Sequence, residues 1–510
     1  MRKWLPLVAV CLGTFMLLVD VTIVTVALPD MARSLHTTFS DLQWVMDVYA
    51  LVLAALLLAA GSLGDRAGHR RLYTGGLVVF AAASLACGLA TDPGELIAFR
   101  AVQGVGGAAM LATTVALISH LYSGRDRGTA FGVWGAVNGA AAAAGPIMGG
   151  LLTQHLDWRW IFFVNLPISV AAVLMTVRYV GESRGERRGR LDLAGLVTFT
   201  TAAALATYAL IKGNDYGWGS ARTVGAFAVA GVALVAFVAA EVRGQAPLLD
   251  LGLFRRGTFT GVMIGALMLS GAAFSYLAYE SLWLQSVLDM GPVTAGLCFL
   301  PMSVAAFFTA ALSGRLLEDR IAPGPQIGAG LLLIAAGAAA QLAIGAGSTW
   351  TVLVPGLVVT GVGVGLSTPM LVSTAVSAVG YQRAGMASGA VNTARQLGNA
   401  LGIAVLGVLF HSGLSSSAHD SGIGGLTDRL ASGQSGMVLA QTAPEQRPVL
   451  DQAVHGAFAS GLRSAVLAAA VMGAVGGLAA LLLVRRPAAG DGTGTGAAQN
   501  AKSQAVAVEL

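Results

Sequence analysis

Fourteen long apolar segments follow one another along this chain, and they constrain its fold more than any other feature. Each is close to the ~20 residues that a helix needs to cross the hydrocarbon core of a bilayer. A segment in lipid must satisfy its own backbone hydrogen bonds, as a helix does. The approximate limits of the segments are residues 5–28, 43–62, 72–90, 96–119, 129–152, 160–180, 192–211, 223–241, 259–285, 294–313, 326–345, 351–376, 387–411 and 460–484. We therefore predict an all-α integral membrane protein with fourteen transmembrane helices.

The composition agrees with a lipid bilayer as the main partner of the chain. Hydrophobic residues make up 55% of the sequence and charged residues 11%, whereas about 25% of a soluble domain is charged. The 68 glycines fit helices that must approach one another closely. No basic block is interleaved with aromatic residues, which argues against nucleic acid as a partner. The three cysteines, Cys11, Cys87 and Cys298, are far apart and lack disulfide or metal-site spacing, so we expect no metal.

The Lys and Arg residues predict the orientation of the spans. If the N-terminus is cytoplasmic, 21 of the 30 Lys and Arg residues lie at cytoplasmic span ends. The first residues resemble a signal peptide but lack a small-residue cleavage site, so we interpret them as a retained first span. The Lys-poor, Ala-, Gly- and Arg-rich usage suggests a GC-rich bacterial genome. We expect a multi-pass protein of a bacterial cell (inner) membrane, with both termini cytoplasmic and a disordered cytoplasmic tail at residues 486–510.

Two short stretches recur at nearly the same interval. "LGDR", which contains Asp65, recurs as "LEDR", which contains Asp319, 254 residues later. "VQGVGGAAML", which contains Gly104, recurs loosely as "VTGVGVGLSTPML", with Gly361 at an interval of 257 residues. The intervals predict two homologous six-helix bundles, at residues 1–180 and 258–485. Residues 181–257 are then a linker with two inserted transmembrane helices, and a long polar outer loop covers about 412–458. Many secondary transporters consist of such repeated bundles with a site at their interface.

Five motifs occur in order along the spans. They are "VDVTIVTVALPDM" from Val19, "GSLGDRAGHRR" from Gly61, "RAVQGVGGA" from Arg100, "GPIMGG" from Gly145 and "DWRWIFFVNLPI" from Asp157. Together they resemble the fourteen-span drug/proton antiporter family of the major facilitator superfamily. The resemblance marks Gly145, Pro146, Gly149 and Gly150 as the antiporter motif of span five. It also implies a conformational role for Asp65 and Arg66.

The second motif concentrates charge at the cytoplasmic end of span two. A carboxylate at Asp65 can cap the positive N-terminus of a helix in the other bundle. The arginines can pair with acids at other inner span ends, such as Glu318 or Asp319. Contacts of this kind would hold an inner gate shut, although positive charge alone would also orient the span. The predicted gate residues are Gly61, Asp65, Arg66, Gly68, Arg70, Asp319 and Arg320.

Three charged residues lie within the outer halves of the first spans: Asp20, Asp47 and Arg100. Charges in the hydrocarbon are costly and mark functional sites. Their similar depth means that they can meet, and a carboxylate beside an arginine in a partly dry cavity can be switched by water or substrate. We predict that they couple transport to protons; a static ion pair is the alternative, and Asp47 is the weaker candidate.

Polar residues in two later spans predict a substrate cavity. Span thirteen carries Asn392, Arg395, Gln396 and Asn399 at helical spacing, and interhelical hydrogen bonding is the alternative for them. Span nine carries Tyr276 and Glu280, with Trp283 on the same face. An acid with aromatic walls attracts cations, although an interfacial aromatic belt fits equally well.

These residues lead to a functional expectation. We expect a proton-coupled antiporter, acting as a monomer, that exports lipophilic, cationic drugs or antibiotics by alternating access. A proton-coupled importer and a dedicated metabolite exporter are close alternatives, and a membrane-embedded sensor or enzyme is a remote one. No Walker motif is present in the sequence, so we expect neither ATP nor any other cofactor and no enzymatic activity.

Overall fold

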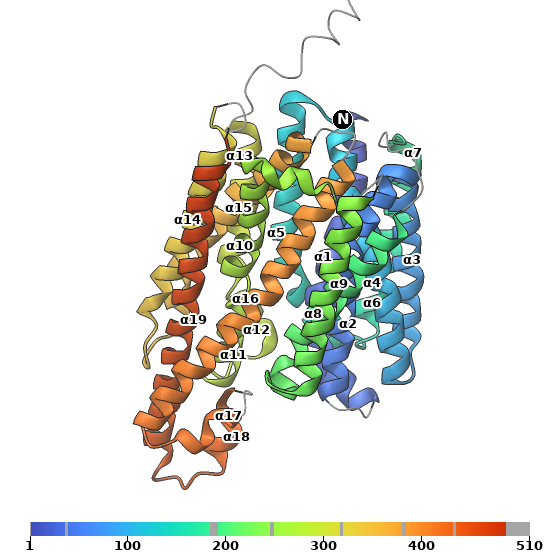
Figure 1. Ribbon diagram of the computed structural model, residues 1–510. Coiled ribbons are helices and arrows are strands. Elements are labelled where there is room, and N and C mark those ends of the chain that lie inside the picture. The colour runs from blue at the N-terminus through green and yellow to red at the C-terminus, as the bar shows by residue number, and fades with distance from the viewer. Residues whose placement is uncertain are drawn as a thin grey trace, which may run out of the picture.

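The chain folds into two bundles of helices that lie side by side (Figure 1). A computed structural model describes residues 2–35, 39–183, 192–244, 249–316, 320–379, 384–431 and 435–485. Every regular element within these ranges is a helix. The all-α prediction is therefore confirmed.

The N-terminal bundle consists of one short 3-10 helix and seven α-helices. Asp92 shows how the sequence starts one of them: its Oδ1 accepts hydrogen bonds from the N–H groups of Gly94 and Glu95 at 2.8 and 3.1 Å, and Pro93 follows it. Both features favour a helix start. The elements are η1 (Arg2–Trp4), α1 (Leu5–Leu35), α2 (Phe39–Ala67), α3 (His69–Leu89), α4 (Pro93–Leu121), α5 (Gly124–His155), α6 (Trp160–Phe163) and α7 (Asn165–Tyr179).

Two inserted helices, α8 (Leu193–Tyr216) and α9 (Ala221–Arg243), follow the N-terminal bundle. The side chains of Asp192 and Ser220 cap their first turns. α8 packs on α9 and also contacts α2 of the first bundle and α16 of the second. Lys212 of α8 is buried, and its Nζ lies 5.0 Å from the ring centroid of Trp44 in α2. α8 thus lies against both α2 and α16, with α9 packed on α8 (Figure 1).

The C-terminal bundle contains several interrupted spans. Predicted span nine is divided into two helices, and so is predicted span ten. The elements are η2 (Leu251–Arg255), α10 (Gly257–Ala273), α11 (Leu277–Ser286), α12 (Pro292–Leu297), α13 (Leu300–Leu316), α14 (Pro323–Ala340), η3 (Gln341–Ala343), η4 (Trp350–Val352), α15 (Leu353–Val379), α16 (Ala384–Asp420), η6 (Gly424–Leu426), α17 (Thr427–Ala431), α18 (Ser435–Ala440) and α19 (Arg447–Leu483).

Twelve helical segments of the described residues are long and apolar enough to cross a membrane. The sequence predicts fourteen. The two predicted spans beyond these twelve are α5 and α8, which are 32 and 24 residues long. Each contains side chains that lie outside the described part of the chain.

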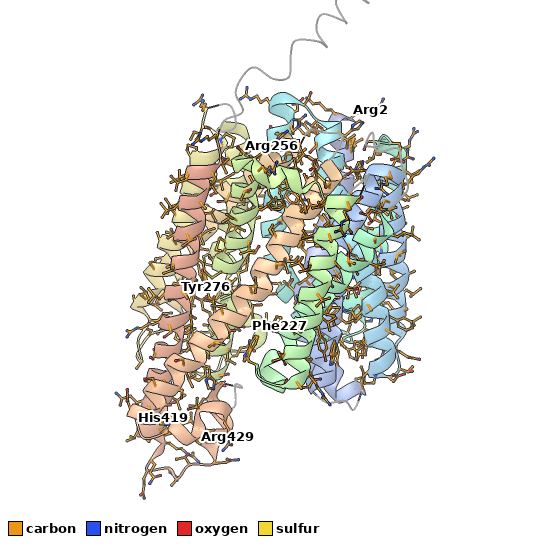
Figure 2. All side chains as sticks on the ribbon, in the orientation of Figure 1. Arg2, Phe227, Arg256, Tyr276, His419 and Arg429 are labelled. Atoms are coloured by element: carbon orange, nitrogen blue, oxygen red, sulfur yellow. The ribbon has the colours of Figure 1, made fainter. Side chains whose placement is uncertain are left out.

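The region predicted as a long loop, about 412–458, is largely helical. α16 continues to Asp420 and α19 begins at Arg447. We call η6, α17 and α18 the helical cap. Its side chains Leu430 and Val438 are buried, which explains why a segment with a polar overall composition folds. Figure 2 shows the cap residue Arg429 near His419 at one end of the molecule, with Arg2 and Arg256 at the other. We call these the cap end and the Arg2 end.

Candidate functional site

A buried ion pair joins α1 to α4. Arg100 Nη1 donates a hydrogen bond to Asp20 Oδ2 at 2.5 Å. The two side chains are 1% and 0% exposed. Such a pair is stable only when further hydrogen bonds compensate for the lost water.

Neighbouring side chains provide that compensation. Gln103 Nε2 and Asn165 Nδ2 both donate to Asp20 Oδ1, at 2.9 and 3.0 Å. Arg100 Nε donates to the carbonyl oxygen of Val45 at 3.0 Å, and Arg100 Nη1 also reaches Gln103 Oε1 at 2.7 Å. The Asp20 carboxylate therefore has one counter-charge and three donors. These hydrogen bonds, two of them from the amide side chains and one from a charged donor, replace those that the buried carboxylate would make with water.

An aromatic ring and a serine complete this network. The Cζ atom of Arg100 lies 4.3 Å from the ring centroid of Tyr49, a cation–π distance. Ser84 Oγ accepts hydrogen bonds from Gln103 and Asn165 at 3.3 and 3.0 Å and donates to a backbone carbonyl. The network thus connects α1, α2, α3, α4 and α7.

The structure brings together two of the three charges predicted to meet, Asp20 and Arg100. Asp47 lies in α2, but its side chain is outside the described residues. Sequence reasoning did not single out Gln103 and Asn165, although both lie within quoted motifs. A polar side chain within an apolar span was the signal that could have found them.

A second buried acid connects the two bundles at the Arg2 end. Asp65 Oδ2 accepts a hydrogen bond from the backbone N–H of Met386 at 3.1 Å. Met386 lies in the first turn of α16, where backbone N–H groups lack helical partners and the helix dipole is positive. The Asp65 carboxylate, at the end of α2, therefore caps a helix of the other bundle.

His69 extends this contact to the chain that leaves α7. Its Nε2 lies 3.0 Å from Asp65 Oδ1, and its Nδ1 lies 3.1 Å from the carbonyl oxygen of Ser183. The glycine before it, Gly68, has a φ of 107°. That value favours glycine and allows the tight turn between α2 and α3.

Arg70 and Arg71 of the same motif contact Glu182, which is not one of the predicted acids. Arg71 Nε lies 3.6 Å from Glu182 Oε2, and the N–H of Arg70 donates to Glu182 Oε1 at 3.1 Å. Predicted partners Glu318 and Asp319 lie outside the described residues. The remaining predicted gate residues are described: Gly61 is buried, Arg66 is half-buried and Arg320 is exposed.

The glycines of the fifth-span motif lie at close helix contacts. A Cβ atom on Gly145 would collide with Thr22 of α1, and one on Gly150 would collide with Val293 of α12 in the other bundle. Gly149 is buried as well. α5 continues through Pro146 without interruption. The motif therefore lets α5 pack closely against α1 of its own bundle and against α12 of the other bundle.

A third buried acid, Glu280, lies in the C-terminal bundle. It is 0% exposed, and neither carboxylate oxygen has a hydrogen-bond partner among the described residues. One turn earlier, the hydroxyl group of buried Tyr276 lies 3.3 Å from Thr360 Oγ1 and 3.5 Å from Gln341 Nε2. Figure 2 shows Tyr276 between the two ends of the molecule. Tyr276 and Trp283 are both buried in the bundle, which disfavours the interfacial-belt interpretation.

The polar residues predicted on span thirteen lie on α16. Asn392 is buried and donates from Nδ2 to the carbonyl oxygen of Ser388 at 3.0 Å. The carbonyl oxygen of Asn399 accepts from Ser275 Oγ at 3.2 Å. Arg395 and Gln396 are half-buried, and Arg395 Nε has no partner among the described residues. α16 contacts α11, the helix of Glu280.

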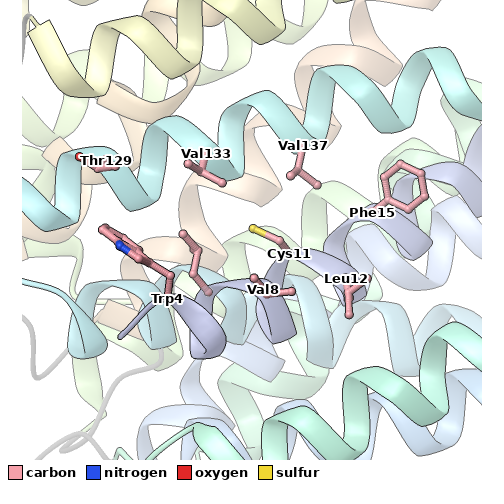
Figure 3. Close-up of a pocket in the computed structure, with 9 residues that line it drawn as sticks. Trp4, Val8, Cys11, Leu12, Phe15, Thr129, Val133 and Val137 are labelled. Carbon is pink, nitrogen blue, oxygen red and sulfur yellow. The ribbon is translucent and has the colours of Figure 1, made fainter. Parts of the chain in front are cut away.

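An apolar groove of about 550 Å³ runs between α1 and α5 (Figure 3). Its volume falls within the range of about 300–1,000 Å³ of small-molecule pockets. It lies nearer the Arg2 end than the Asp20 network does, because Trp4 lines one end of it and Phe15 the other. The lining residues are Trp4, Leu7, Val8, Cys11, Leu12, Phe15, Thr129, Val133 and Val137.

Comparison with known proteins shows what the whole chain is similar to. Residues 10–403 match the Major Facilitator Superfamily. The chain is 36% identical to the tetracenomycin C resistance and export protein of Streptomyces glaucescens, over 81% of this chain and 76% of that protein. It is 37% identical to the multidrug resistance protein Stp of Mycobacterium tuberculosis, over 81% and 77%. The puromycin resistance protein of Streptomyces alboniger is also 37% identical, over 79% and 81%.

The fold agrees with a solved transporter structure. The human organic anion transporter MFSD10 superposes with a TM-score of 0.62 over 94% of this chain and 99% of that one. The two sequences are 15% identical, so the likeness concerns the fold alone.

Proposed function

Because this chain belongs to the major facilitator superfamily, we propose that it is a secondary exporter that expels lipophilic compounds in exchange for protons by alternating access. Relatives named for resistance to tetracenomycin C and puromycin and for multidrug resistance support export. The observation that carries the proposal is the buried Asp20–Arg100 pair, since ionisable groups within the hydrocarbon are costly and mark functional sites.

The proposed topology has fourteen spans, with both termini in the cytoplasm of a bacterium and the Arg2 end facing inward. The lengths of α5 and α8 support two spans beyond the twelve. The excess of Lys and Arg at that end supports the orientation. The protein would work as a monomer in the cell membrane, with protons and a lipophilic substrate as its partners.

The Asp65–Met386 hydrogen bond supports an inner gate. It joins α2 of one bundle to α16 of the other, so opening at the Arg2 end must break it. The inserted helix α8 contacts the same two helices and covers them on the lipid side. In the proposed cycle, substrate enters when this contact is broken and leaves toward the cap end when it has re-formed.

A positively charged, lipophilic substrate fits the buried acids and the apolar lining best. Glu280 has no described partner and lies one turn from an aromatic ring, and such sites attract cations. The groove of Figure 3 offers an apolar surface on the cytoplasmic half of α1.

Export of one dedicated acidic metabolite is the second candidate. Arg395 favours it, because a guanidinium group remains charged in proteins and its Nε has no described partner. Substrates with a carboxylate would then be preferred over cations.

The test is a growth-inhibition panel in an efflux-deficient bacterium that expresses the protein. The panel contains lipophilic cations, matched neutral compounds and matched carboxylic acids. Resistance to the cations, lost in Asp20→Asn, supports the proposal, while resistance to acids alone selects the second candidate. Uptake driven by an inward proton gradient would make the protein an importer and reject export.

A further inference from the structure

The predicted span that contains Glu280 is interrupted between α10 and α11. α10 ends at Ala273 and α11 begins at Leu277, with Tyr276 at the N-cap of α11. The 17 residues of α10 rise about 25 Å at ~1.5 Å per residue, whereas the hydrocarbon core is about 30 Å thick. Discontinuous membrane helices often form the binding sites of transporters. Glu280 therefore lies in the first turns of a half-helix, near such a break.

Among the described residues, the surroundings of Glu280 contain hydrogen-bonding groups, and no ion pair to Glu280 is formed. Tyr276, Gln341 and Thr360 form one buried polar cluster. Both Glu280 oxygens and Gln341 Oε1 lack a partner among the described residues. Gly337 and Gly356 allow this cluster to form, because a Cβ at these positions would collide with Thr360 and Gln341 respectively.

The described charged side chains on neighbouring helices form their hydrogen bonds and ion pairs with groups other than Glu280. Arg463 of α19 donates from Nε to the carbonyl oxygen of Ile344 at 2.6 Å. His455 of α19 faces Asp451, with 3.6 Å between Nδ1 and Oδ1. Arg395 of α16 forms no described ion pair with Glu280. Two tyrosines are close to Glu280 along the chain: Tyr279 is adjacent to it and donates its hydroxyl hydrogen bond to the carbonyl oxygen of Ile403, and Tyr276 precedes it by one turn at the N-cap of α11.

Two of the fully buried acids, Asp20 and Glu280, therefore differ in what surrounds their carboxylates. Asp20 has an arginine and two amide donors, so its charge is balanced without a proton. An ionised Glu280 would be a buried charge with neither an ion pair nor a hydrogen bond among the described residues, which is unfavourable. A bound proton neutralises Glu280 and so removes the free-energy cost of the buried charge. At Asp20 the arginine and the two amide donors already offset that cost.

On the basis of the proposed function, we propose that Glu280 holds the exchangeable proton of the transport cycle, while Asp20 and Arg100 remain a fixed ion pair in this conformation. Tyr276, one turn before the acid, belongs to the buried polar cluster with Gln341 and Thr360. Substrate or water that reaches Glu280 supplies the compensation that the closed site lacks, and the proton leaves.

The helical cap gives this site a connection to the cap end. Ser435 of α18 donates a hydrogen bond from Oγ to the carbonyl oxygen of Ser286, the last residue of α11. Tyr279 of α11 donates to the carbonyl oxygen of Ile403 in α16 at 2.7 Å. Since α11 is tied to both elements, displacement of the cap or of α16 would move Glu280 and admit water to it.

Infrared spectroscopy of the purified protein tests the proposal without any substrate. A neutral carboxylic acid has a carbonyl stretching band that an ionised carboxylate lacks. We expect such a band in the wild type at mildly acidic pH, its loss in Glu280→Gln and its retention in Glu280→Asp and Asp20→Asn. A band that persists unchanged in Glu280→Gln, or disappears in Asp20→Asn instead, would overturn the proposal. Circular dichroism and gel filtration establish that each variant is folded.

Proton movement in proteoliposomes provides the second readout, with ethidium as a lipophilic cation. We expect ethidium to cause proton release through the wild type and not through Glu280→Gln, whereas Glu280→Asp restores part of it. Full proton release by Glu280→Gln would reject the assignment of Glu280. Absence of ethidium-dependent release in the wild type would instead reject proton-coupled export of this cation, and the infrared result would still decide the protonation of Glu280.

Discussion

The carboxylate of Asp65 and the backbone N–H of Met386 are 321 residues apart in sequence and 3.1 Å apart in the structure. This hydrogen bond joins the two bundles where α2 ends and α16 begins. His69 contacts the other oxygen of the same carboxylate. Asp65 thus connects the two bundles directly, and through His69 it is linked to Ser183 in the chain that follows α7.

Asp65→Asn should slow transport without removing the protein from the membrane. The hydrogen bonds of a charged acceptor contribute about 1.5–3 kcal/mol each, and a neutral amide weakens them and loses the interaction with the helix dipole. The initial rate of ethidium efflux, normalised to the amount of protein, should fall by about tenfold or more, as 1.4 kcal/mol corresponds to a factor of ten. Asp126→Asn is the control, because Asp126 pairs with Lys3 in an exposed ion pair of little energetic value. Wild-type efflux in Asp65→Asn would contradict a gating role.

Arg100→Gln should destabilise the fold more than the combined variant Asp20→Asn/Arg100→Gln. Removal of the arginine alone leaves Asp20 buried and charged, at a cost of about 3–5 kcal/mol. The second substitution removes that charge, so part of the stability should return. Thermal unfolding of the purified variants in detergent gives the comparison. Additive losses of stability would mean that the two side chains do not depend on each other.

Gly106→Ala should disrupt the contact between α3 and α4. A Cβ at Gly106 would lie 2.7 Å from the backbone nitrogen of Phe80 and 2.8 Å from the carbonyl oxygen of Gly76. Backbone cannot move aside as a flexible side chain can, and overpacking of this kind costs about 1–3 kcal/mol. Gly231→Ala in α9 is the matched control, because its Cβ would meet nothing within 4 Å. That variant should be neutral or more stable by about 0.5–1 kcal/mol. Equal melting temperatures for the two variants would refute the packing argument.

Cysteine labelling tests the orientation. Ser416 is exposed near the end of α16, and Gly181 is exposed after α7 with open space around it. An impermeant thiol reagent added to intact cells should label Ser416→Cys and should label Gly181→Cys only after lysis. The three native cysteines are buried, so the unmodified protein provides the background. The reverse pattern would invert the proposed topology.

The sequence by itself determined the all-α membrane class, the approximate positions of the spans and the family. These follow from local properties: the length of each apolar run, the charges between runs and short motifs such as "RAVQGVGGA". It also placed Asp20 and Arg100 at similar depths, because a helix rises by a constant amount per residue.

Only the tertiary structure decided which of these residues touch and what surrounds each charge. Gln103, Asn165 and Ser84 complete the Asp20–Arg100 network from three different helices, and no spacing along the chain encodes that convergence. The break before Leu277 and the helical cap likewise depend on packing between distant elements. Two acids that look alike in sequence, Asp20 and Glu280, therefore differ in the structure: one has a counter-charge and the other lacks a described partner. The cost of a buried charge depends on its neighbours in space, and the folded chain selects those neighbours.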